Sequence, residues 1–432
     1  MRRLAALFAL LFGLAVVLPS ARAATNDVLR GRQWNLDKVG AEAAWPIANG
    51  SGVTVAVVDS GVDFQHEDLQ GKLVPGRDFV DKDDDAQDQQ GHGTHVAGLI
   101  GAATGNGRGI AGVAPGVKIL PVRVLDANGE GTLADVIDGI RWATANGAKV
   151  INLSLGDELQ SIFGPGFSDA LRDAWDAGVV CVVAAGNQFV TGSGFTNEPA
   201  LIVSATDRND NSPTYSSGVG SAKWGMAAPG GEIPTLGQMN AILSSYWVDD
   251  AHDEYAYLAG TSQAAPHVSA AVAILLSTGK FTPTQAVQRL LDTAVDVGEK
   301  GRDPVFGFGR LDLAAATKDV NIGSTSSTTT TTGGGGGRGG GTTDTTAGNP
   351  GASTTALPLP TLAPPTVVPD QPADPPVADG PNITVVGSAG TGDDDGNSRT
   401  VPILIGALIL VAATAGGVWW WWWGRLAPDP SP

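Results

Sequence analysis

The stretch Gly260-Thr-Ser-Gln-Ala-Ala-Pro266, which runs on into the apolar segment His267–Leu276, decides how this chain of 432 residues folds. Its apolar side chains recur at helical spacing, which predicts a long helix that begins near Ser262. The first N–H groups of a helix have no backbone partners and stabilise negative charge. Ser262 is therefore a candidate nucleophile if a base and a carboxylate lie elsewhere in the chain, and otherwise a helix cap.

The region from Asp27 to Asp319 alternates between continuous apolar segments and amphipathic ones. Strands are predicted at Val53–Val58, Lys118–Val124, Lys149–Leu155, Val179–Ala185 and Leu201–Ala205, and further helices at Val96–Ala103, Leu133–Ala145 and Ser168–Ala177. Apolar strands that alternate with helices predict an α/β fold of three layers, with a mainly parallel sheet covered by helices on both faces. Ligands bind at the carboxyl ends of such strands.

Two further polar motifs lie where strands end or helices begin. Val57-Val-Asp59-Ser-Gly61 places a carboxylate at the end of an apolar strand, and Gly91-His92-Gly-Thr-His95-Val-Ala-Gly98 places a histidine at a loop-to-helix junction. Each alone could be a turn or a cap. His92 with His95 could also suggest zinc, but no third ligand follows at a recognisable spacing. Together, Asp59, His92 and Ser262 supply the carboxylate, the base and the nucleophile that acyl transfer requires.

These three motifs resemble, in content and in chain order, those of the subtilisin-like serine proteases, or subtilases. The resemblance covers residues 27–318 and implies a serine endopeptidase that cuts proteins or peptides through an acyl-enzyme intermediate. It also implies that Asn187 contributes to the oxyanion hole. The residues implied to contact substrate are Ser154, Leu155 and Gly156, Ala184, Ala185 and Gly186, and the edge positions Gly129, Glu130 and Gly131. One departure is Gln263, where subtilases usually carry methionine.

The acidic loops resemble those of the thermitase branch of the family, which implies structural calcium. The first implied ligand set is Asp27, Asp68 and Asn106 with the backbone carbonyls of Ala103, Arg108 and Ile110. The second implied set is Asp78, Asp81, Asp83, Asp85 and Gln87. Hard oxygen ligands at alternating positions suit Ca²⁺, and a solvated acidic surface is the alternative.

Both ends of the chain predict secretion and membrane attachment. Residues 1–23 have the basic start, the apolar run and the Ala21-Arg-Ala23 cleavage site of a signal peptide. Residues 24–319 form the predicted peptidase domain, and the Ser/Thr/Gly/Pro-rich linker 320–400 is expected to be disordered because its composition cannot build a core. Val401–Trp423 carries no charge, ends in consecutive tryptophans and has the length of a transmembrane helix, leaving residues 424–432 as a short cytoplasmic tail. We expect a single-pass protein of the cell membrane whose catalytic domain is extracellular.

The formal net charge of −18 argues against a nucleic-acid partner, because binding phosphates needs a basic surface. The single cysteine, Cys181, lies in an apolar run and rules out an intrachain disulfide. We expect the catalytic domain to be a monomer. The short segment before Asp27 and the C-terminal span also resemble those of mycosins, the membrane-anchored subtilases of type VII secretion, although mycosins generally carry disulfides. A second alternative is an inactive subtilase-like binding module, which would require the loss of a catalytic residue.

Overall fold

The structure is a computed structural model that describes residues 25–155, 165–188, 196–233, 240–249, 251–320 and 383–385. All of them belong to one unit of the chain, Met1–Ser388. The predicted signal peptide 1–23, nearly all of the linker 320–400, the span 401–423, the tail 424–432 and Gly156 lie outside the described residues. Among the helices that are described, none combines the length and the apolar character needed to cross a bilayer.

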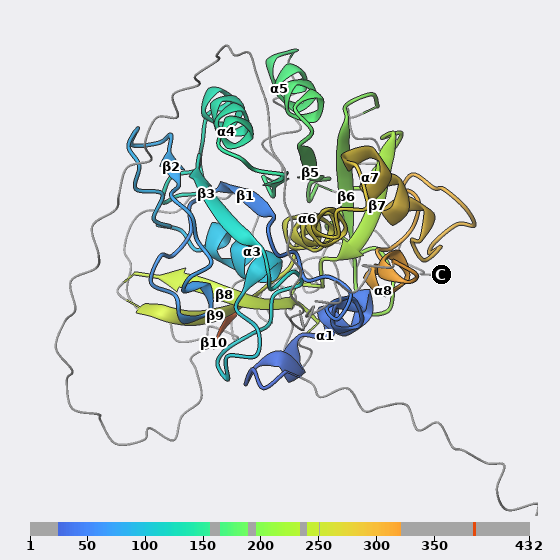
Figure 1. The fold of residues 1–432 in the computed structure, drawn as a ribbon, viewed down its shortest axis with the longest axis horizontal. Coiled ribbons are helices and arrows are strands. Elements are labelled where there is room, and N and C mark those ends of the chain that lie inside the picture. The colour runs from blue at the N-terminus through green and yellow to red at the C-terminus, as the bar shows by residue number, and fades with distance from the viewer. Residues whose placement is uncertain are drawn as a thin grey trace, which may run out of the picture. The chain divides into compact units, whose positions relative to one another are not determined.

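In the described part of the chain, a parallel sheet of seven strands forms the middle layer (Figure 1). Its spatial order is β2 (Arg77–Asp78), β3 (Lys118–Arg123), β1 (Thr54–Asp59), β4 (Val150–Leu153), β5 (Val180–Ala184), β6 (Ala200–Thr206) and β7 (Trp224–Pro229). The chain proceeds from β1 to β2 and β3 on one side and continues with β4 on the other. The direction of winding therefore changes between β1 and β4, which is where open parallel sheets place their ligand sites.

Helices cover both faces of this sheet (Figure 1). Helices α4 (Leu133–Ala145) and α5 (Pro165–Asp176) pack on one face, and α3 (His92–Gly101) and α6 (Thr261–Ser277) pack on the other. Within β1, alternate residues join opposite cores. This two-sided burial explains why the strands are apolar throughout, and the predicted α/β architecture is present.

Helix α6 is enclosed on all sides. Every residue from Thr261 to Leu275 is buried, and the helix contacts α3 and the strands β4 to β7. A helix that is buried all round carries apolar and small residues on every face, as this sequence does. Its polar members need partners within the protein, and His267 finds them in the Asn35 side chain at 2.8 Å and the Gln263 carbonyl at 2.8 Å.

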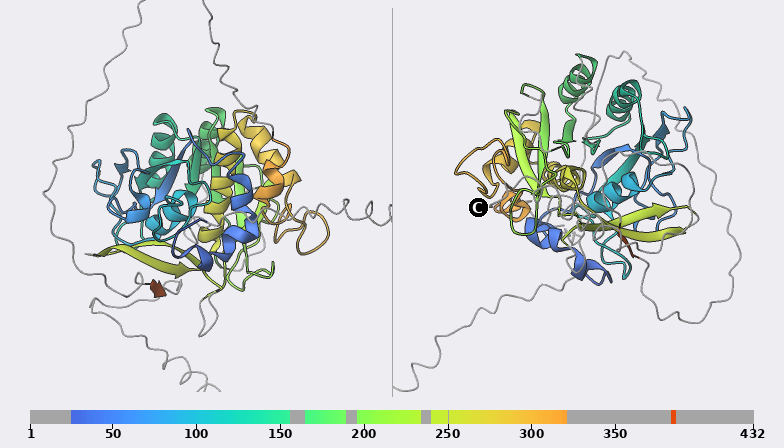
Figure 2. Two further views of the ribbon diagram at one scale, coloured as in Figure 1. Left: turned by 60° about the horizontal axis from the view of Figure 1, so that its bottom comes forward. Right: turned by 180° about the vertical axis from the view of Figure 1, so that it is seen from behind.

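A hairpin of β8 (Ile242–Val248) and β9 (Ala251–Leu258) packs against α3 (Figure 2), and β10 (Ile383–Val385) pairs in parallel with β9. Gly98 permits the close approach of α3 and the hairpin, because a Cβ there would lie 2.1 Å from Ser245 Oγ. The sequence reading identified neither this hairpin nor β7. The remaining elements are η1 (Arg30–Arg32), α1 (Trp34–Val39), α2 (Ala41–Ala44), η2 (Glu67–Leu69), α7 (Pro283–Asp292) and α8 (Leu313–Thr317).

Two fully buried histidines predict that the fold loses stability in acid. Burial lowers the pKa of His95 to about 3 and that of His267 to about 4, so both are neutral when folded. The unfolded chain takes up these protons below about pH 6.5. These two histidines therefore do not reduce the free energy of unfolding above that pH. As the pH decreases toward 4 and then 3, each imidazole lowers the free energy of unfolding by about 1.4 kcal/mol per pH unit.

Urea unfolding between about pH 6 and about pH 4.5 measures this slope. Carboxylates also titrate in this range, so the comparison is with His95→Gln, which removes one imidazole but keeps a hydrogen-bond donor. We expect a shallower slope in the variant. If the free energy of unfolding of the parent and of His95→Gln fell equally steeply with pH, the lowered pKa of His95 would be contradicted.

Candidate active site

The predicted carboxylate and the predicted base are in contact. Asp59 is the last residue of β1 and is fully buried, and His92 is the first residue of α3. The ring Nδ1 of His92 lies 2.8 Å from Asp59 Oδ1, and the same oxygen accepts the Ser60 N–H at 2.8 Å. A carboxylate accepts hydrogen bonds, so Nδ1 carries the proton and Nε2 is left as the base.

Glycines on each side of His92 let α3 approach its neighbours closely. Gly91 has φ 102°, and a Cβ there would lie 2.5 Å from the Tyr246 ring. A Cβ on Gly93 would lie 2.1 Å from the Gly61 carbonyl oxygen and 3.2 Å from Asp59 Cβ. The first turn of α3 therefore packs directly on the end of β1, which is why the motif needs glycine at both positions.

Ser262 lies in the first turn of α6 and is 6% exposed. Its hydroxyl donates to the Ser154 carbonyl at 3.0 Å, and its own carbonyl accepts the Ser154 hydroxyl at 2.7 Å. Pro266 explains the second bond. Proline has no N–H to donate to the carbonyl four residues earlier, so the Ser262 carbonyl is available to a residue of another element.

The start of α6 also reaches the predicted base. The side-chain nitrogen of Gln263, which is 2% exposed, lies 3.5 Å from His92 Nε2. Behind Ser154, the Asn152 amide donates to the Ser154 hydroxyl and accepts the Ser269 hydroxyl, both at 2.8 Å. These contacts bring the three predicted catalytic residues to one edge of the sheet, with Ser262 bonded to the residue after β4 and its neighbour Gln263 next to His92.

Asn187 follows β5 and faces the same helix. Its side-chain oxygen accepts the Thr261 N–H at 2.9 Å and the Thr261 hydroxyl at 3.1 Å, and that hydroxyl accepts the Gly186 N–H at 3.1 Å. The orientation of the amide is thereby fixed, with its oxygen toward the backbone of the residue before Ser262.

The residues predicted to contact substrate fall on neighbouring strand ends. Ser154 and Leu155 follow β4, Ala184 ends β5, which pairs with β4, and Ala185 and Gly186 follow β5. Gly129 and Gly131 lie in the loop between β3 and α4, where a Cβ on Gly131 would be 2.3 Å from the Val124 carbonyl oxygen. The two strand ends and this loop therefore lie at the carboxyl edge of the sheet, and their contact with substrate stays a prediction.

The first predicted calcium location gathers buried oxygens. The Asp27 carboxylate accepts the N–H groups of Gly105 and Asn106 at 2.9 and 3.0 Å, and Asp68 accepts the Asn106 side-chain amide at 2.9 Å. Burial raises the pKa of Asp68, although hydrogen bonds from Ile110, Asn106 and Tyr255 oppose the rise. The predicted ligands Ala103 and Ile110 contact Asp68 through their N–H groups. Both carboxylates are buried and are the kind of oxygen ligand that a hard cation prefers, whereas the groups that contact them here are hydrogen-bond donors.

The second predicted location is arranged differently. Asp78 and Asp81 bond to the buried guanidinium of Arg123 at 2.5 and 2.6 Å. The other predicted ligands accept N–H groups of their own loop: Asp83 accepts from Asp85, and Asp85 from Gln87. In the described part of the chain, no three acidic, histidine or cysteine side chains converge on one point. Calcium at both locations therefore stays a prediction, and Arg123 supplies positive charge at the second.

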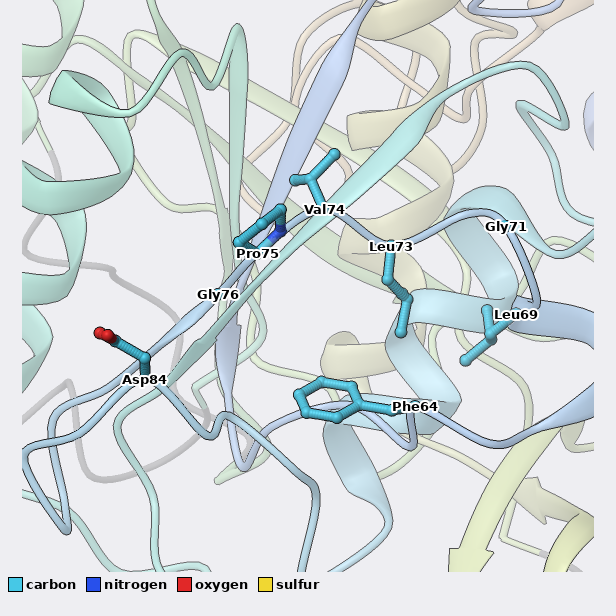
Figure 3. Close-up of a pocket in the computed structure, with 8 residues that line it drawn as sticks. All are labelled: Phe64, Leu69, Gly71, Leu73, Val74, Pro75, Gly76 and Asp84. Carbon is cyan, nitrogen blue, oxygen red and sulfur yellow. The ribbon is translucent and has the colours of Figure 1, made fainter. Parts of the chain in front are cut away.

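A separate concavity of about 270 Å³ lies beside the loop between β1 and β2 (Figure 3). The side chains of Phe64, Leu69 and Leu73 line it, and Asp84 stands at its other end. No residue of the predicted triad lines this cavity, so it is distinct from the site described above.

Sequence reasoning missed one buried carboxylate next to the site. Asp88 is fully buried four residues before His92, and burial raises its pKa although hydrogen bonds from Gly91, Thr94 and Gln90 oppose the rise. Its sequence signal was weak, because it ends a run of acidic residues that resembles a solvated loop.

A base held by a buried carboxylate beside a serine at a helix N-terminus is the arrangement of serine hydrolases. Residues 50–309 match the Subtilase family, and the chain belongs to that family. Thermitase of Thermoactinomyces vulgaris is 44% identical over 254 residues, which cover 58% of this chain and 84% of thermitase. The thermophilic serine proteinase of Bacillus sp. (strain AK1) is 39% identical over 296 residues, covering 66% of this chain and 67% of that relative.

The solved structures agree. Proteases from Pseudoalteromonas arctica PAMC 21717 superpose with a TM-score of 0.60 at 32% identity, covering 69% of this chain and 100% of that chain. The predicted subtilisin-like α/β fold and the predicted serine endopeptidase activity are therefore confirmed.

Proposed function

We propose that this protein is a secreted, membrane-tethered serine endopeptidase in which Ser262, His92 and Asp59 carry the reaction. The observation that supports the proposal most is the 2.8 Å contact between His92 Nδ1 and Asp59, with the first turn of α6 against the other ring nitrogen. The Ser262 oxygen bonds to the scissile carbonyl carbon while its proton passes to His92 Nε2. That proton then goes to the leaving amine as the peptide C–N bond breaks, and water hydrolyses the acyl-enzyme by the reverse proton route.

Substrate binding itself would release the nucleophile. The Ser262 hydroxyl donates to the Ser154 carbonyl, and Ser154 belongs to the segment proposed to pair with the substrate backbone as an added strand. A substrate N–H that donates to this carbonyl competes with the Ser262 hydroxyl, which then turns toward His92. Occupation of the cleft and activation of the serine are thus coupled in the proposal.

Asn187 and the Ser262 backbone N–H would stabilise the oxyanion. Two hydrogen bonds from Thr261 fix the amide oxygen of Asn187, which sets the direction of its nitrogen before substrate arrives. A donor that is already oriented needs no reorganisation when charge develops. Small residues at Ala184, Ala185 and Gly186 would leave room for varied apolar side chains of the substrate.

Ser262→Ala is expected to reduce hydrolysis of a chromogenic peptide to the background rate, because no other hydroxyl replaces the nucleophile. Ser277→Ala is the matched control, since that hydroxyl bonds only to the Ile274 carbonyl at the far end of α6. The measurement is kcat/KM for the parent and both variants. Equal rates above background for the parent and Ser262→Ala would overturn the role of Ser262, and background rates in both would favour the inactive binding module.

We also propose that calcium binds at Asp27, Asp68 and Asn106 as a structural ion. Removing it with a chelator is expected to lower the melting temperature by about 5 °C, because an ion that binds only the folded state stabilises it. Asp68→Asn should make the melting temperature insensitive to chelator. The control is chelator already saturated with calcium. A parent whose melting temperature ignores free chelator contradicts the proposal.

The proposed membrane tether rests on the apolar segment 401–423. Full-length protein expressed with its signal peptide is expected in the membrane fraction, and a chain that ends after Val320 in the culture medium. Both should hydrolyse the same chromogenic peptide, which separates location from activity. Full-length, uncleaved protein in the medium would show that the segment does not anchor the chain.

A further inference from the structure

Asp88 gathers five neutral hydrogen-bond donors although it is completely buried. Its Oδ1 accepts the Ser60 hydroxyl and the N–H groups of Gln90 and Gly91, each at 2.9 Å. Its Oδ2 accepts the Thr94 N–H at 2.9 Å and the Thr94 hydroxyl at 2.5 Å. A carboxylate removed from water is costly unless its oxygens are satisfied, and here they are satisfied entirely by donors of the active-site segments.

These donors lie on both sides of the Asp59–His92 contact. Ser60 follows Asp59 at the end of β1, while Gly91 precedes His92 and Thr94 lies two residues after it. The Ser60 hydroxyl, which donates to Asp88, also accepts the Gly93 N–H at 3.0 Å. Asp88 and Ser60 together therefore connect the strand that carries the carboxylate with the helix turn that carries the base.

The same contacts complete the N-terminus of α3. The first N–H groups of a helix have no partner within it. Here the His92 N–H donates to the Gln90 side chain at 2.9 Å, the Gly93 N–H to Ser60, and the Thr94 N–H to Asp88. A negative group at this end is also favoured by the helix dipole. Asp88 thus replaces the side-chain cap that the N-cap residue Gly91 cannot provide.

Only a carboxylate fits this position. Both oxygens accept hydrogen bonds, and an amide of the same shape would turn an NH₂ group toward buried donors at one of them. Those donors would lose their partners in a place that water does not reach. The chain therefore has a reason to bury a charged group four residues before its predicted base.

We propose that Asp88 is a positioning residue for peptide hydrolysis. It fixes the first turn of α3 against the end of β1 and so sets the geometry of the hydrogen bond between His92 and Asp59. It touches neither substrate nor the reacting atoms.

The test compares Asp88→Asn with the parent in the full-length chain. We expect kcat for a chromogenic peptide to fall about 100-fold, the cost of misplacing a reacting group by about 1 Å, with little change in KM. We also expect the low-field proton resonance of the His92 Nδ1–H, which reports its bond to Asp59, to shift or broaden. A residue that only stabilises the fold would leave both readouts at the parent values.

Asp303→Asn is the matched control. Asp303 is also a buried turn aspartate, 5% exposed, and accepts the N–H groups of Val305 and Phe306 at 2.7 and 2.8 Å, between α7 and α8. It should lower the melting temperature but preserve kcat and the low-field resonance. If Asp88→Asn likewise loses only melting temperature, the proposal is wrong.

Ser60→Ala keeps the test decisive if Asp88→Asn fails to fold. This change removes the connection from Asp88 to the end of β1 and leaves the four other contacts of Asp88 in place. It also removes the partner of the Gly93 N–H. We expect a folded protein with kcat reduced about 30-fold, which corresponds to two net hydrogen bonds. Parent values of kcat and of the low-field resonance in Ser60→Ala would overturn the proposal.

Discussion

The structure depends on the burial of helix α6 from Thr261 to Leu275 between the sheet and α3. A helix without an exposed face cannot satisfy its polar groups with water, so its first turn must find partners on neighbouring elements. The Asn187 side chain accepts the Thr261 N–H, and the Ser154 hydroxyl donates to the carbonyl of Ser262. The burial of α6 in the core thereby determines which strand ends contact the first turn of the helix. The site lies where Asn187, Ser154 and this turn meet.

Much of this architecture follows from local sequence. The strands β1, β4, β5 and β6 are continuous apolar runs because both faces are covered, and such runs are recognisable without a structure. Strand β7 and the β8–β9 hairpin are different. Strand β7 contains glycine and proline, and the hairpin contains two consecutive serines, Ser244 and Ser245, that donate to carbonyls of α3. Their strand character depends on tertiary partners, which spacing along the chain does not reveal.

The site shows the same division. Asp59, His92 and Ser262 lie in short glycine-bounded motifs, so their convergence could be predicted. Asp88 could not be told from the acidic residues before it, because burial and not residue type makes it different. The role of Arg123 could not be predicted either. Arg123 lies opposite Asp59 in the register of β1 and β3, and it bonds to Asp78, which is distant in sequence. Arg123 offsets the negative charge of the acidic loop because the order of the strands places β3 next to β2.

Pro266 gives the molecule an unusual constraint. Because this proline cannot donate to the Ser262 carbonyl, Ser154, the residue after β4, donates the hydrogen bond that a helix residue normally supplies. The hydrogen bond from the Ser154 hydroxyl to the Ser262 carbonyl then both stabilises the helix and positions its reactive serine. A substitution at Ser154 or Pro266 therefore changes thermal stability and turnover at the same time. These two positions should be substituted together, or not at all, as related enzymes diverge.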